Sequence, residues 1–302
     1  MKAPIVLIAN PAAKRASEHK IKQAARLLRS AGREVAIYLT EKRGDAETIA
    51  KRAAGDNVPL IIAAGGDGTF NEVINGIAHT DTKLAILPMG TTNVLAKELS
   101  IPEDVEGALK VALSENVHTV SLGRIDFTPH LACPELAEGS LLTRYFCLMA
   151  GVGFDGEAVY GINESVKRYS GKGAYILSGL KTLLSYSPEV LTFAANGKTC
   201  TGYSAIIGKA SKYGGNFRVT PDASLLNHEI YICIMHGKKR LDILRYVSGI
   251  LMGTHLRFKD ITYLKTTSVE IKGQAHIQID GDYLGRTPAT ITVAPDALRL
   301  IF

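Results

Sequence analysis

Residues 60–76 read LIIAAGGDGTFNEVING, an apolar run followed by three glycines within four positions and then by a helical pattern. The apolar run predicts a buried strand over residues 60–63, and the later pattern predicts a helix over residues 69–77. Glycine allows unusual backbone dihedral angles and a close approach to a ligand. The amides that begin the helix, together with the positive end of its dipole, favour a bound phosphate. A tight turn without a ligand is the alternative interpretation of these residues.

The surrounding sequence divides into two parts with different patterns. From residue 4 to about residue 122, apolar runs alternate with helical patterns, which is typical of a parallel sheet flanked by helices. The expected strands are 5–8, 35–38, 60–63 and 84–87, each buried on both faces, and the expected helices are 18–30, 45–54 and 69–77. A chain of 302 residues also exceeds the usual size of a single core. We therefore expect an α/β domain over residues 1–122 and a β-rich domain over residues 123–295.

The second part contains longer intervals between strands, with runs such as 229–233 and 275–279. Helical stretches are expected over residues 156–185 and 241–256, and a hairpin loop is expected over residues 128–139. The segment 241–252 is apolar enough to shape an acyl pocket or to touch a bilayer, but a core helix is the favoured interpretation. Lys167, Arg168, Lys172 and Lys181 offer a basic surface to anionic lipid, and a solvated helix face explains them equally well.

Small polar residues follow all four strands of the first part. Residues 88–93 read PMGTTN after the fourth strand, Asn10 follows the first strand and Thr40 follows the second. Ligands of open α/β sheets bind beyond the carboxyl ends of the strands, so these groups are expected along one rim. Neither a Walker loop nor a dinucleotide fingerprint is present.

Composition limits the classes of partner and compartment. The net charge of +6 favours anionic partners, but the basic residues are dispersed, which argues against nucleic acid. The four cysteines form no CxxC pair, so neither a zinc site nor a disulfide framework is expected. No secretory leader pattern and no run of about 18 apolar residues occurs, so the expected location is cytoplasmic.

The strings GGDGTFNE over residues 65–72 and GTTN over residues 90–93 resemble the catalytic domain of diacylglycerol kinases, sphingosine kinases and related bacterial lipid kinases. GGDG alone is shared with NAD kinases and phosphofructokinases, whereas the combination is specific. The likeness continues through Ser100-Ile101-Pro102, the GVGFD string over residues 151–155, the YGG string over residues 213–215, Pro221, Ala223 and the DGD string over residues 280–282.

The resemblance implies an α/β first domain of the NAD-kinase/diacylglycerol-kinase type and a β-sandwich-like second domain, with the active site in a cleft between them. A last strand at about residues 296–302 would return to the first domain. The implied reaction uses ATP with Mg²⁺ and phosphorylates a lipid hydroxyl, such as that of diacylglycerol. The implied setting is lipid metabolism, with the substrate presented at a membrane surface and the enzyme in peripheral contact with the inner face. The oligomeric state is left open.

The strand-end loops and the motif match together give a set of expected nucleotide-binding residues. They are Asn10, Thr40, Gly65, Gly66, Asp67, Gly68, Thr69, Phe70, Asn71, Glu72, Gly90, Thr91, Thr92 and Asn93. An ordinary turn is an alternative interpretation for Asn10 and for Thr40.

The expected catalytic residues are Asp280 and Asp282. Phosphoryl transfer needs alignment, charge neutralisation and a carboxylate that accepts the proton of the attacking hydroxyl. One aspartate would activate the lipid hydroxyl and the other would engage Mg²⁺, without any indication of which is the base. An Asp-Gly hairpin turn is a rival interpretation of the same residues.

Two departures from the family pattern affect these expectations. The related bacterial kinases usually carry Glu where this chain has Asp282, so the carboxylate is one methylene shorter. The family's auxiliary Mg²⁺ site, held by an Asp and by backbone carbonyls, would fall near Ser224, Asn227 and Glu229. Because Asn227 lacks a charge, a hard cation would bind there only weakly.

Two other functions compete with the lipid kinase. An NAD kinase shares GGDG and a related fold, but the middle of this chain lacks the Asn-Thr/Asn-Asp-Gly element of that enzyme. A nucleotide-sensing or lipid-binding regulator without catalysis would be expected to have lost Asp67 or Asp280, and both are present.

Overall fold

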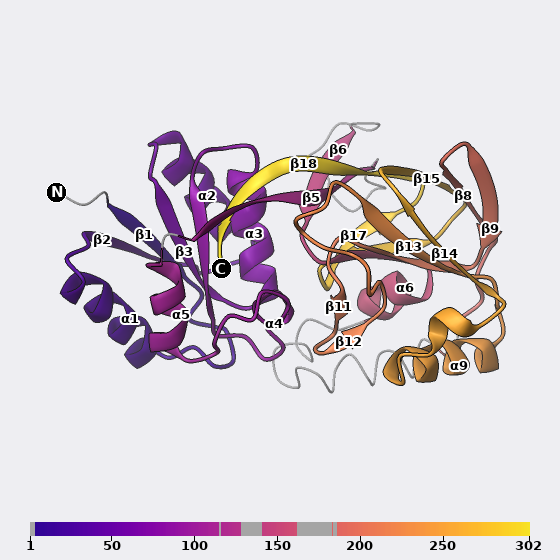
Figure 1. Ribbon diagram of the computed structural model, residues 1–302, viewed down its shortest axis with the longest axis horizontal. Coiled ribbons are helices and arrows are strands. Elements are labelled where there is room, and N and C mark those ends of the chain that lie inside the picture. The colour runs from indigo at the N-terminus through magenta and orange to yellow at the C-terminus, as the bar shows by residue number, and fades with distance from the viewer. Residues whose placement is uncertain (1–3, 115, 128–140, 162–182, 184–185) are drawn as a thin grey trace. The chain divides into compact units, whose positions relative to one another are not determined.

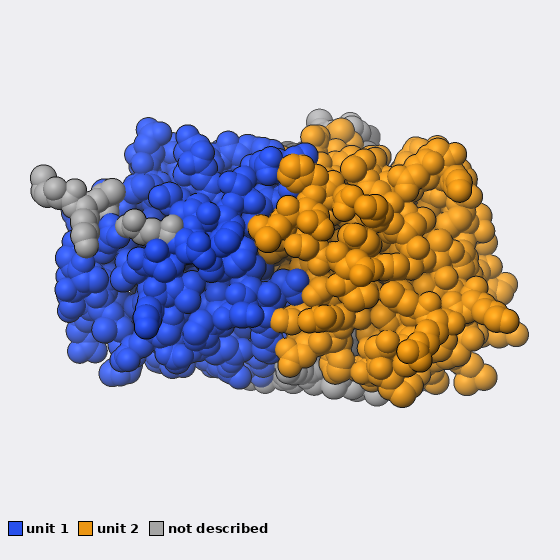
Figure 2. All heavy atoms as spheres, in the orientation of Figure 1, with its two compact units in different colours: residues 1–122, 295–302 blue, residues 123–294 orange. Residues whose placement is uncertain are grey.

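A computed structural model of the chain describes residues 4–114, 116–127, 141–161, 183 and 186–302 (Figure 1). The chain forms two compact units, the first from residues 1–122 and 295–302 and the second from residues 123–294 (Figure 2). The loop predicted over residues 128–139, the basic residues Lys167, Arg168, Lys172 and Lys181, and most of the helix predicted over residues 156–185 lie outside the described residues.

The first unit contains a parallel sheet with the strand order β2-β1-β3-β4-β18. Its strands are β1 (Ile5–Ala9), β2 (Val35–Leu39), β3 (Leu60–Gly65), β4 (Lys83–Pro88) and the end of β18 (Ala289–Ile301). The helices are α1 (Glu18–Ser30), α2 (Asp45–Gly55), α3 (Asp67–Ile77), α4 (Val94–Glu98) and α5 (Val105–Ala112), and β5 (Val117–Phe127) leads into the second unit. The predicted α/β architecture is confirmed, and the last strand of the chain pairs with β4 of the first unit.

The edge strand β2 differs from the prediction that every strand is buried on both faces. Its side chains are largely exposed, including Leu39 at 54%. Because β2 is at the end of the strand order, it has a neighbour on one side only. The sequence of β2 has four aliphatic residues and one tyrosine, so composition alone did not mark it as an edge strand.

Helix α3 begins two residues earlier than predicted. Gly66 is its N-cap in an extended conformation, and Asp67 and Gly68 already belong to the first turn. The prediction placed Gly-Asp-Gly in a loop because glycines allow unusual backbone dihedral angles. The observed boundary brings the free amides of the helix directly against the end of β3.

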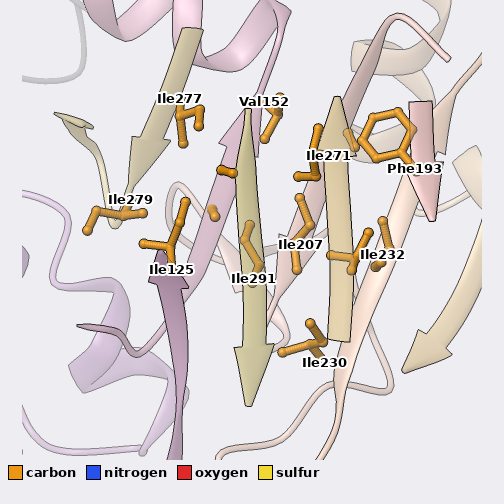
Figure 3. Packing of buried hydrophobic residues seen from close by; sticks show 14 of the residues in the cluster. Ile125, Val152, Phe193, Ile207, Ile230, Ile232, Ile271, Ile277, Ile279 and Ile291 are labelled. Carbon is orange, nitrogen blue, oxygen red and sulfur yellow. The ribbon is translucent and has the colours of Figure 1, made fainter. Parts of the chain in front are cut away.

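The second unit is a sandwich of two antiparallel sheets. One sheet has the order β14-β13-β10-β7-β16-β17, and the other contains β15, β8 and β9 with parts of β18, β5 and β6. Isoleucines and aromatic residues of both sheets gather into one apolar cluster between them (Figure 3). The strands are β6 (Leu142–Phe146), β7 (Met149–Val152), β8 (Leu191–Ala195), β9 (Lys198–Gly202), β10 (Ser204–Gly208), β11 (Lys212–Tyr213), β12 (Phe217–Arg218), β13 (Ile230–Met235), β14 (Ile261–Thr266), β15 (Ser268–Lys272), β16 (His276–Ile279) and β17 (Asp282–Arg286).

Helices of the second unit include α6 (Phe154–Tyr160), α9 (Arg240–Leu251) and the 3₁₀ turn η1 (His255–Arg257). The helical stretch predicted over residues 241–256 is present but shorter, and the core-helix interpretation of residues 241–252 holds for one face only. The helix ends at Leu251, and Gly253 beyond it has a φ of +69° that terminates the helical path. Only one face of α9 is buried, whereas leucines on the other face are exposed. Among the described residues, no helix is both long enough and apolar enough to cross a bilayer.

Candidate active site

The phosphate-loop candidate lies where β3 meets α3 in the first unit. The first intrahelical bond of α3 is donated by the Phe70 amide to the Gly66 carbonyl at 3.1 Å. The amides of residues 67–69 therefore precede the helical hydrogen-bond ladder, at the positive end of the helix dipole. This is the backbone geometry that binds a phosphate group.

The loop over residues 90–93 lies directly against the first loop. A Cβ atom added to Gly90 would approach the Cα of Gly66 to 2.7 Å, so any side chain at position 90 would separate the two loops. Asn93 is fully buried, with a φ of +48°. Its Oδ1 accepts from the Gly90 amide at 2.9 Å, and its Nδ2 donates to the Gly90 carbonyl at 3.2 Å. Asn93 thus holds the loop in a closed turn.

Asp67 joins the two loops through its carboxylate. The amides of Val94 and Leu95, the first two residues of α4, each donate to one carboxylate oxygen at 3.0 Å. Burial raises the pKa of Asp67, and the two amide bonds act in the opposite direction. The carboxylate therefore fixes the start of α4 relative to the start of α3.

Glu72 and Phe70, two further predicted residues, also have structural roles. Glu72 accepts from the Ala46 amide at 3.1 Å, in the first turn of α2, and so connects α2 with α3. Phe70 is fully buried in the core of the first unit. The predicted residues Asp67, Phe70, Glu72 and Asn93 thus build and brace the loops through their side chains.

The remaining predicted residues sit around the same loops. Asn10 donates from Nδ2 to the Thr69 hydroxyl at 3.2 Å, which connects the end of β1 with the first turn of α3. The Thr40 amide bonds the Ala9 carbonyl at 3.0 Å, so the end of β2 is fixed beside the end of β1. The carbonyl of Thr92 accepts from Lys97 Nζ at 2.6 Å. Of the others, Asn71 bonds Asn75 within α3, Gly65 and Gly90 are buried, and Gly66, Gly68 and Thr91 are partly exposed.

In the second unit, Asp280 and Gly281 form a two-residue turn between β16 and β17. Their φ angles of +48° and +88° are those of a tight hairpin turn that favours Asp-Gly. Three consecutive amides, of Cys147, Leu148 and Met149, each donate to the Asp280 carboxylate at 2.9 Å. The hairpin interpretation of this motif therefore holds in the structure, and the turn is bound to the segment that enters β7.

The two aspartates of the motif have different surroundings. A carboxylate offers about four lone-pair positions, and the three amides take three of those of Asp280. The Cys147 thiol lies 3.4 Å from one oxygen of the same carboxylate. Asp282 is the first residue of β17 and is only partly buried. Asp280 thus anchors the turn, and Asp282 begins the strand that follows it.

A buried polar network under this turn was missed from the sequence. Gln278 accepts from the Gly281 amide at 2.7 Å and donates to the Asp155 carboxylate at 2.6 Å. The Tyr213 hydroxyl donates to the other oxygen of Asp155. Burial raises the pKa of Asp155, while the two donors act to lower it. The residues GVGFD and YGG, known at first only as likenesses, therefore support the Asp280–Asp282 hairpin.

The glycine of this network supplies the signal that could have revealed it. A Cβ atom at Gly151 would fall 1.8 Å from a carboxylate oxygen of Asp155 and 2.7 Å from Gln278 Nε2. The absence of a side chain at Gly151 is what lets the Asp155 carboxylate pack against the backbone here.

The auxiliary metal site considered near Ser224, Asn227 and Glu229 contains a lysine. Lys209 is fully buried, and its Nζ donates to the Asn227 carbonyl at 2.7 Å and to the Ser224 carbonyl. Glu229 accepts instead from Lys265 Nζ at 2.9 Å. An ammonium group therefore binds the carbonyls that a cation would need, and these residues do not fit a divalent metal. Burial lowers the pKa of Lys209 to about 8, and the charge of Glu229 opposes that shift.

Comparisons with known proteins identify the family of this chain. Residues 4–125 match the family model of the diacylglycerol kinase catalytic domain, and residues 149–302 match that of the YegS C-terminal NAD kinase beta sandwich-like domain. Diacylglycerol kinases of two Staphylococcus aureus strains, bovine RF122 / ET3-1 and NCTC 8325 / PS 47, are 30% identical over 268 residues, which are 87% of this chain and 80% of theirs. The chain belongs to the diacylglycerol kinase family. It is a phosphotransferase with an alcohol group as acceptor, and the family uses ATP as phosphate donor.

Solved structures show the same fold for this family member. The crystal structure of a diacylglycerol kinase from Bacillus anthracis strain Sterne has a TM-score of 0.71 and 20% identity, and it covers 100% of this chain and 98% of that one. Another structure from the same organism has a TM-score of 0.78 and 23% identity, with coverages of 99% and 95%.

Asp67→Ala is expected to reduce both the stability of this kinase and its affinity for nucleotide. The variant leaves two amides of α4 without acceptors, which costs about 1–2 kcal/mol of unfolding free energy. The loops then lose their mutual position. Urea unfolding and ATP titration by calorimetry measure the two effects.

The matched control is Asp104→Ala, which removes the N-cap bond to the Gly107 amide at 2.7 Å in the neighbouring helix α5. It is expected to lose similar stability and to keep its ATP affinity. Equal losses of ATP affinity in both variants would contradict the specific role of Asp67.

Lys209→Met is expected to lower the unfolding free energy by about 2–3 kcal/mol at pH 7, because two buried carbonyls lose their donor. The folded protein releases the Lys209 proton near pH 8, whereas the ordinary value of 10.5 applies to the unfolded chain. Between these values the unfolded state binds more protons, so the stability of the wild type rises with pH relative to the variant, by about 1.4 kcal/mol per unit. Urea titrations from pH 7.5 to 10 measure this difference, and the exposed Lys265→Met serves as control. A flat difference would contradict the buried charge.

Proposed function

We propose that this kinase transfers the γ-phosphoryl group of ATP to the free hydroxyl of diacylglycerol. The observation that carries the proposal is the 30% identity over 87% of the chain to proteins named diacylglycerol kinase. The catalytic-domain match over residues 4–125 contains both loops of the first unit. The geometry of the two loops and of the Asp280 turn suggests a chemical role for the GGDGTFNE, GTTN and DGD strings.

The loops of the first unit support the binding of the nucleotide phosphates. The amides of residues 67–69 lie at the start of α3 directly after β3, and Asp67 and Asn93 fix the neighbouring loop before any ligand arrives. Donors that are already aligned need no reorganisation when charge develops on the transferred phosphoryl group. The proposed ATP site therefore uses backbone amides as its main recognition elements, and its acidic residues serve to hold those amides in place.

The Asp280 turn supports a role for Asp282 as the general base. In the proposed step, a lone pair of the lipid hydroxyl oxygen forms a bond to the γ-phosphorus as the bond from that phosphorus to the bridging oxygen of ADP breaks. The hydroxyl proton passes to a carboxylate. Because three amides already bind Asp280, the proton acceptor that we propose is Asp282, positioned by the rigid turn before it.

Mg²⁺ is proposed to arrive with ATP. Within the described residues, no three His, Cys, Asp or Glu side chains form a group that could hold a metal ion. The carboxylates of Asp67 and Asp280 accept backbone amides, and Mg²⁺ in kinases is bound largely by phosphate oxygens and water. The bound cation would neutralise phosphate charge.

One observation favours an alternative substrate. The C-terminal match is to a domain described as NAD kinase beta sandwich-like, so NAD is a rational competitor for the acceptor position. A regulator without catalysis is the other alternative, and the presence of both members of the Asp280–Asp282 pair argues against it.

The purified protein is expected to transfer label from [γ-³²P]ATP to diacylglycerol in detergent micelles with Mg²⁺. The same assay includes monoacylglycerol, a sphingoid base, phosphatidylglycerol and NAD, and the products are separated by chromatography. Label in NAD and in no lipid would overturn the proposal. Label in none of these acceptors, from a protein that still binds ATP, would favour the regulator.

Asp282→Asn and Asp280→Asn are expected to differ in stability although both lose activity. Asp282→Asn removes the proposed base, so kcat falls by a factor of about 10² to 10⁴ with the melting temperature unchanged. Asp280→Asn replaces one acceptor oxygen by an amide group and is expected to lower the melting temperature as well. Calorimetry and steady-state kinetics separate the two. Full activity in Asp282→Asn would contradict its assignment.

A further inference from the structure

The solvent face of α9 is mostly apolar, with Arg240 at its start and the half-buried Ser248 as its polar residues. Leu241, Leu244, Val247, Leu251 and Met252 are exposed by 76%, 47%, 43%, 54% and 68%. The spacing of three and four residues places Leu241, Leu244, Val247 and Leu251 on one side of a helix that rises about 18 Å over its length, and Met252 is its C-cap. The outer face of an ordinary surface helix is polar, so this stripe requires an explanation.

The inner face of α9 is firmly attached to the second unit. Tyr246 is buried, accepts from the Gly237 amide at 2.8 Å and donates to the Asp260 carboxylate at 2.5 Å. A Cβ atom at Gly249 would approach the Phe258 ring to 2.6 Å, which shows how closely the helix packs. The helix is therefore a preformed platform at the periphery of this unit (Figure 1), and its apolar stripe does not result from loose packing.

Of the three charged residues of α9, Arg240 is the first residue of the helix, and Asp242 and Arg245 make contacts beside the stripe. Asp242 accepts from the Lys239 amide at 3.0 Å and so closes the start of the helix. Arg245 pairs with the Asp260 carboxylate, and its guanidinium lies 5.2 Å from the Phe258 ring centre. Both charges are thus engaged beside the stripe.

The segment around the stripe is strongly basic. Residues 238–260 contain six Lys and Arg against two Asp, a net charge of +4 out of +6 for the whole chain. Lys238, Lys239 and Arg240 are exposed at the start of the helix, and Arg257 and Lys259 are exposed beyond its end. The ribbon strand β12, which contacts α9, adds an exposed aromatic residue, Phe217. An apolar stripe bordered by basic groups is the pattern of a helix that lies in a membrane interface.

We propose that α9 docks this protein on an anionic lipid bilayer, with the stripe among the acyl chains and the basic residues among the phosphate headgroups. The charge selects this occupant. A second copy of the chain would bring another +4 segment against the first, which repels, whereas an acidic membrane attracts it. Docking is inferred from the exposed stripe and the surrounding basic residues alone. Its purpose, access to a lipid acceptor, rests on the proposed function.

Tryptophan fluorescence tests the contact directly, because the chain contains no tryptophan. Leu251→Trp provides a probe on the stripe that keeps its apolar character. Val190→Trp provides the matched control, since Val190 is 53% exposed in the same unit and outside α9. With vesicles of equal parts phosphatidylglycerol and phosphatidylcholine, the emission of Leu251→Trp is expected to shift to the blue and that of Val190→Trp to stay unchanged. Unchanged emission of both probes would overturn the proposal.

Charge substitution tests the energy of the contact. The double variant Leu244→Glu, Leu251→Glu is expected to reduce the vesicle partition coefficient by about a hundredfold in sedimentation assays. Val190→Glu is expected to leave it unchanged, and circular dichroism checks that both variants fold. Lys238→Glu with Lys239→Glu is expected to weaken binding to phosphatidylglycerol vesicles at low salt only. Equal vesicle partitioning of wild type and the α9 double variant would sink the proposal.

Activity measurements separate this proposal from the proposed function. The α9 double variant is expected to lose at least tenfold of its activity on long-chain diacylglycerol in vesicles and to keep its activity on soluble dihexanoylglycerol. Vesicle binding through α9 in a protein that phosphorylates no lipid would refute only the proposed function. Full vesicle activity in the double variant would refute only the docking. A dimer in analytical ultracentrifugation that the double variant dissociates would assign the stripe to a second copy instead.

Discussion

The first unit depends on a carboxylate that accepts two backbone amides from a different helix. Val94 and Leu95, at the start of α4, lie 27 and 28 residues beyond Asp67 in the sequence. Their hydrogen bonds to its carboxylate join the two loops. The loops also meet where the Met89 amide donates to the Gly65 carbonyl at 2.7 Å, and where Gly66 and Gly90 approach each other, which requires that both positions lack side chains. The electrostatic bond and the steric requirement act together, so the amides of α3 face a loop of fixed shape.

The second unit uses the same chemistry at Asp280. There the carboxylate accepts three amides from the segment that enters β7. A buried network of Gln278, Asp155 and Tyr213 supports the turn through the bond between Gln278 and the Gly281 amide. In both units, then, an acidic residue that motif reasoning assigns to ligand chemistry is used to position backbone.

The sequence predicted the repeating parts of the structure well, because periodic patterns determine them. The range of α1 and the buried strands β1, β3 and β4 follow from apolar spacing, and the motif strings identified the family and the two loops. The exposure of β2 and of the outer face of α9 was not predictable, because composition does not state which neighbour an apolar face meets. The roles of Asp67 and Asp280 also stayed hidden, since their hydrogen-bond partners are backbone amides and carry no sequence signature. Lys209 gave no signal for the same reason, as its acceptors are carbonyls.

The buried ammonium of Lys209 lies where a separate, dissociable cation would otherwise bind the same carbonyls. A dissociable cation stabilises a fold only to the extent that its free concentration exceeds its dissociation constant. The Lys209 side chain needs no such free concentration, because the folded chain itself brings it to the carbonyls of Ser224 and Asn227, and its charge depends instead on pH, with a pKa lowered to about 8. The stability of the β-sandwich at this point therefore does not depend on a bound divalent ion, and neither a chelator nor a change in the cellular concentration of such ions is expected to alter it there.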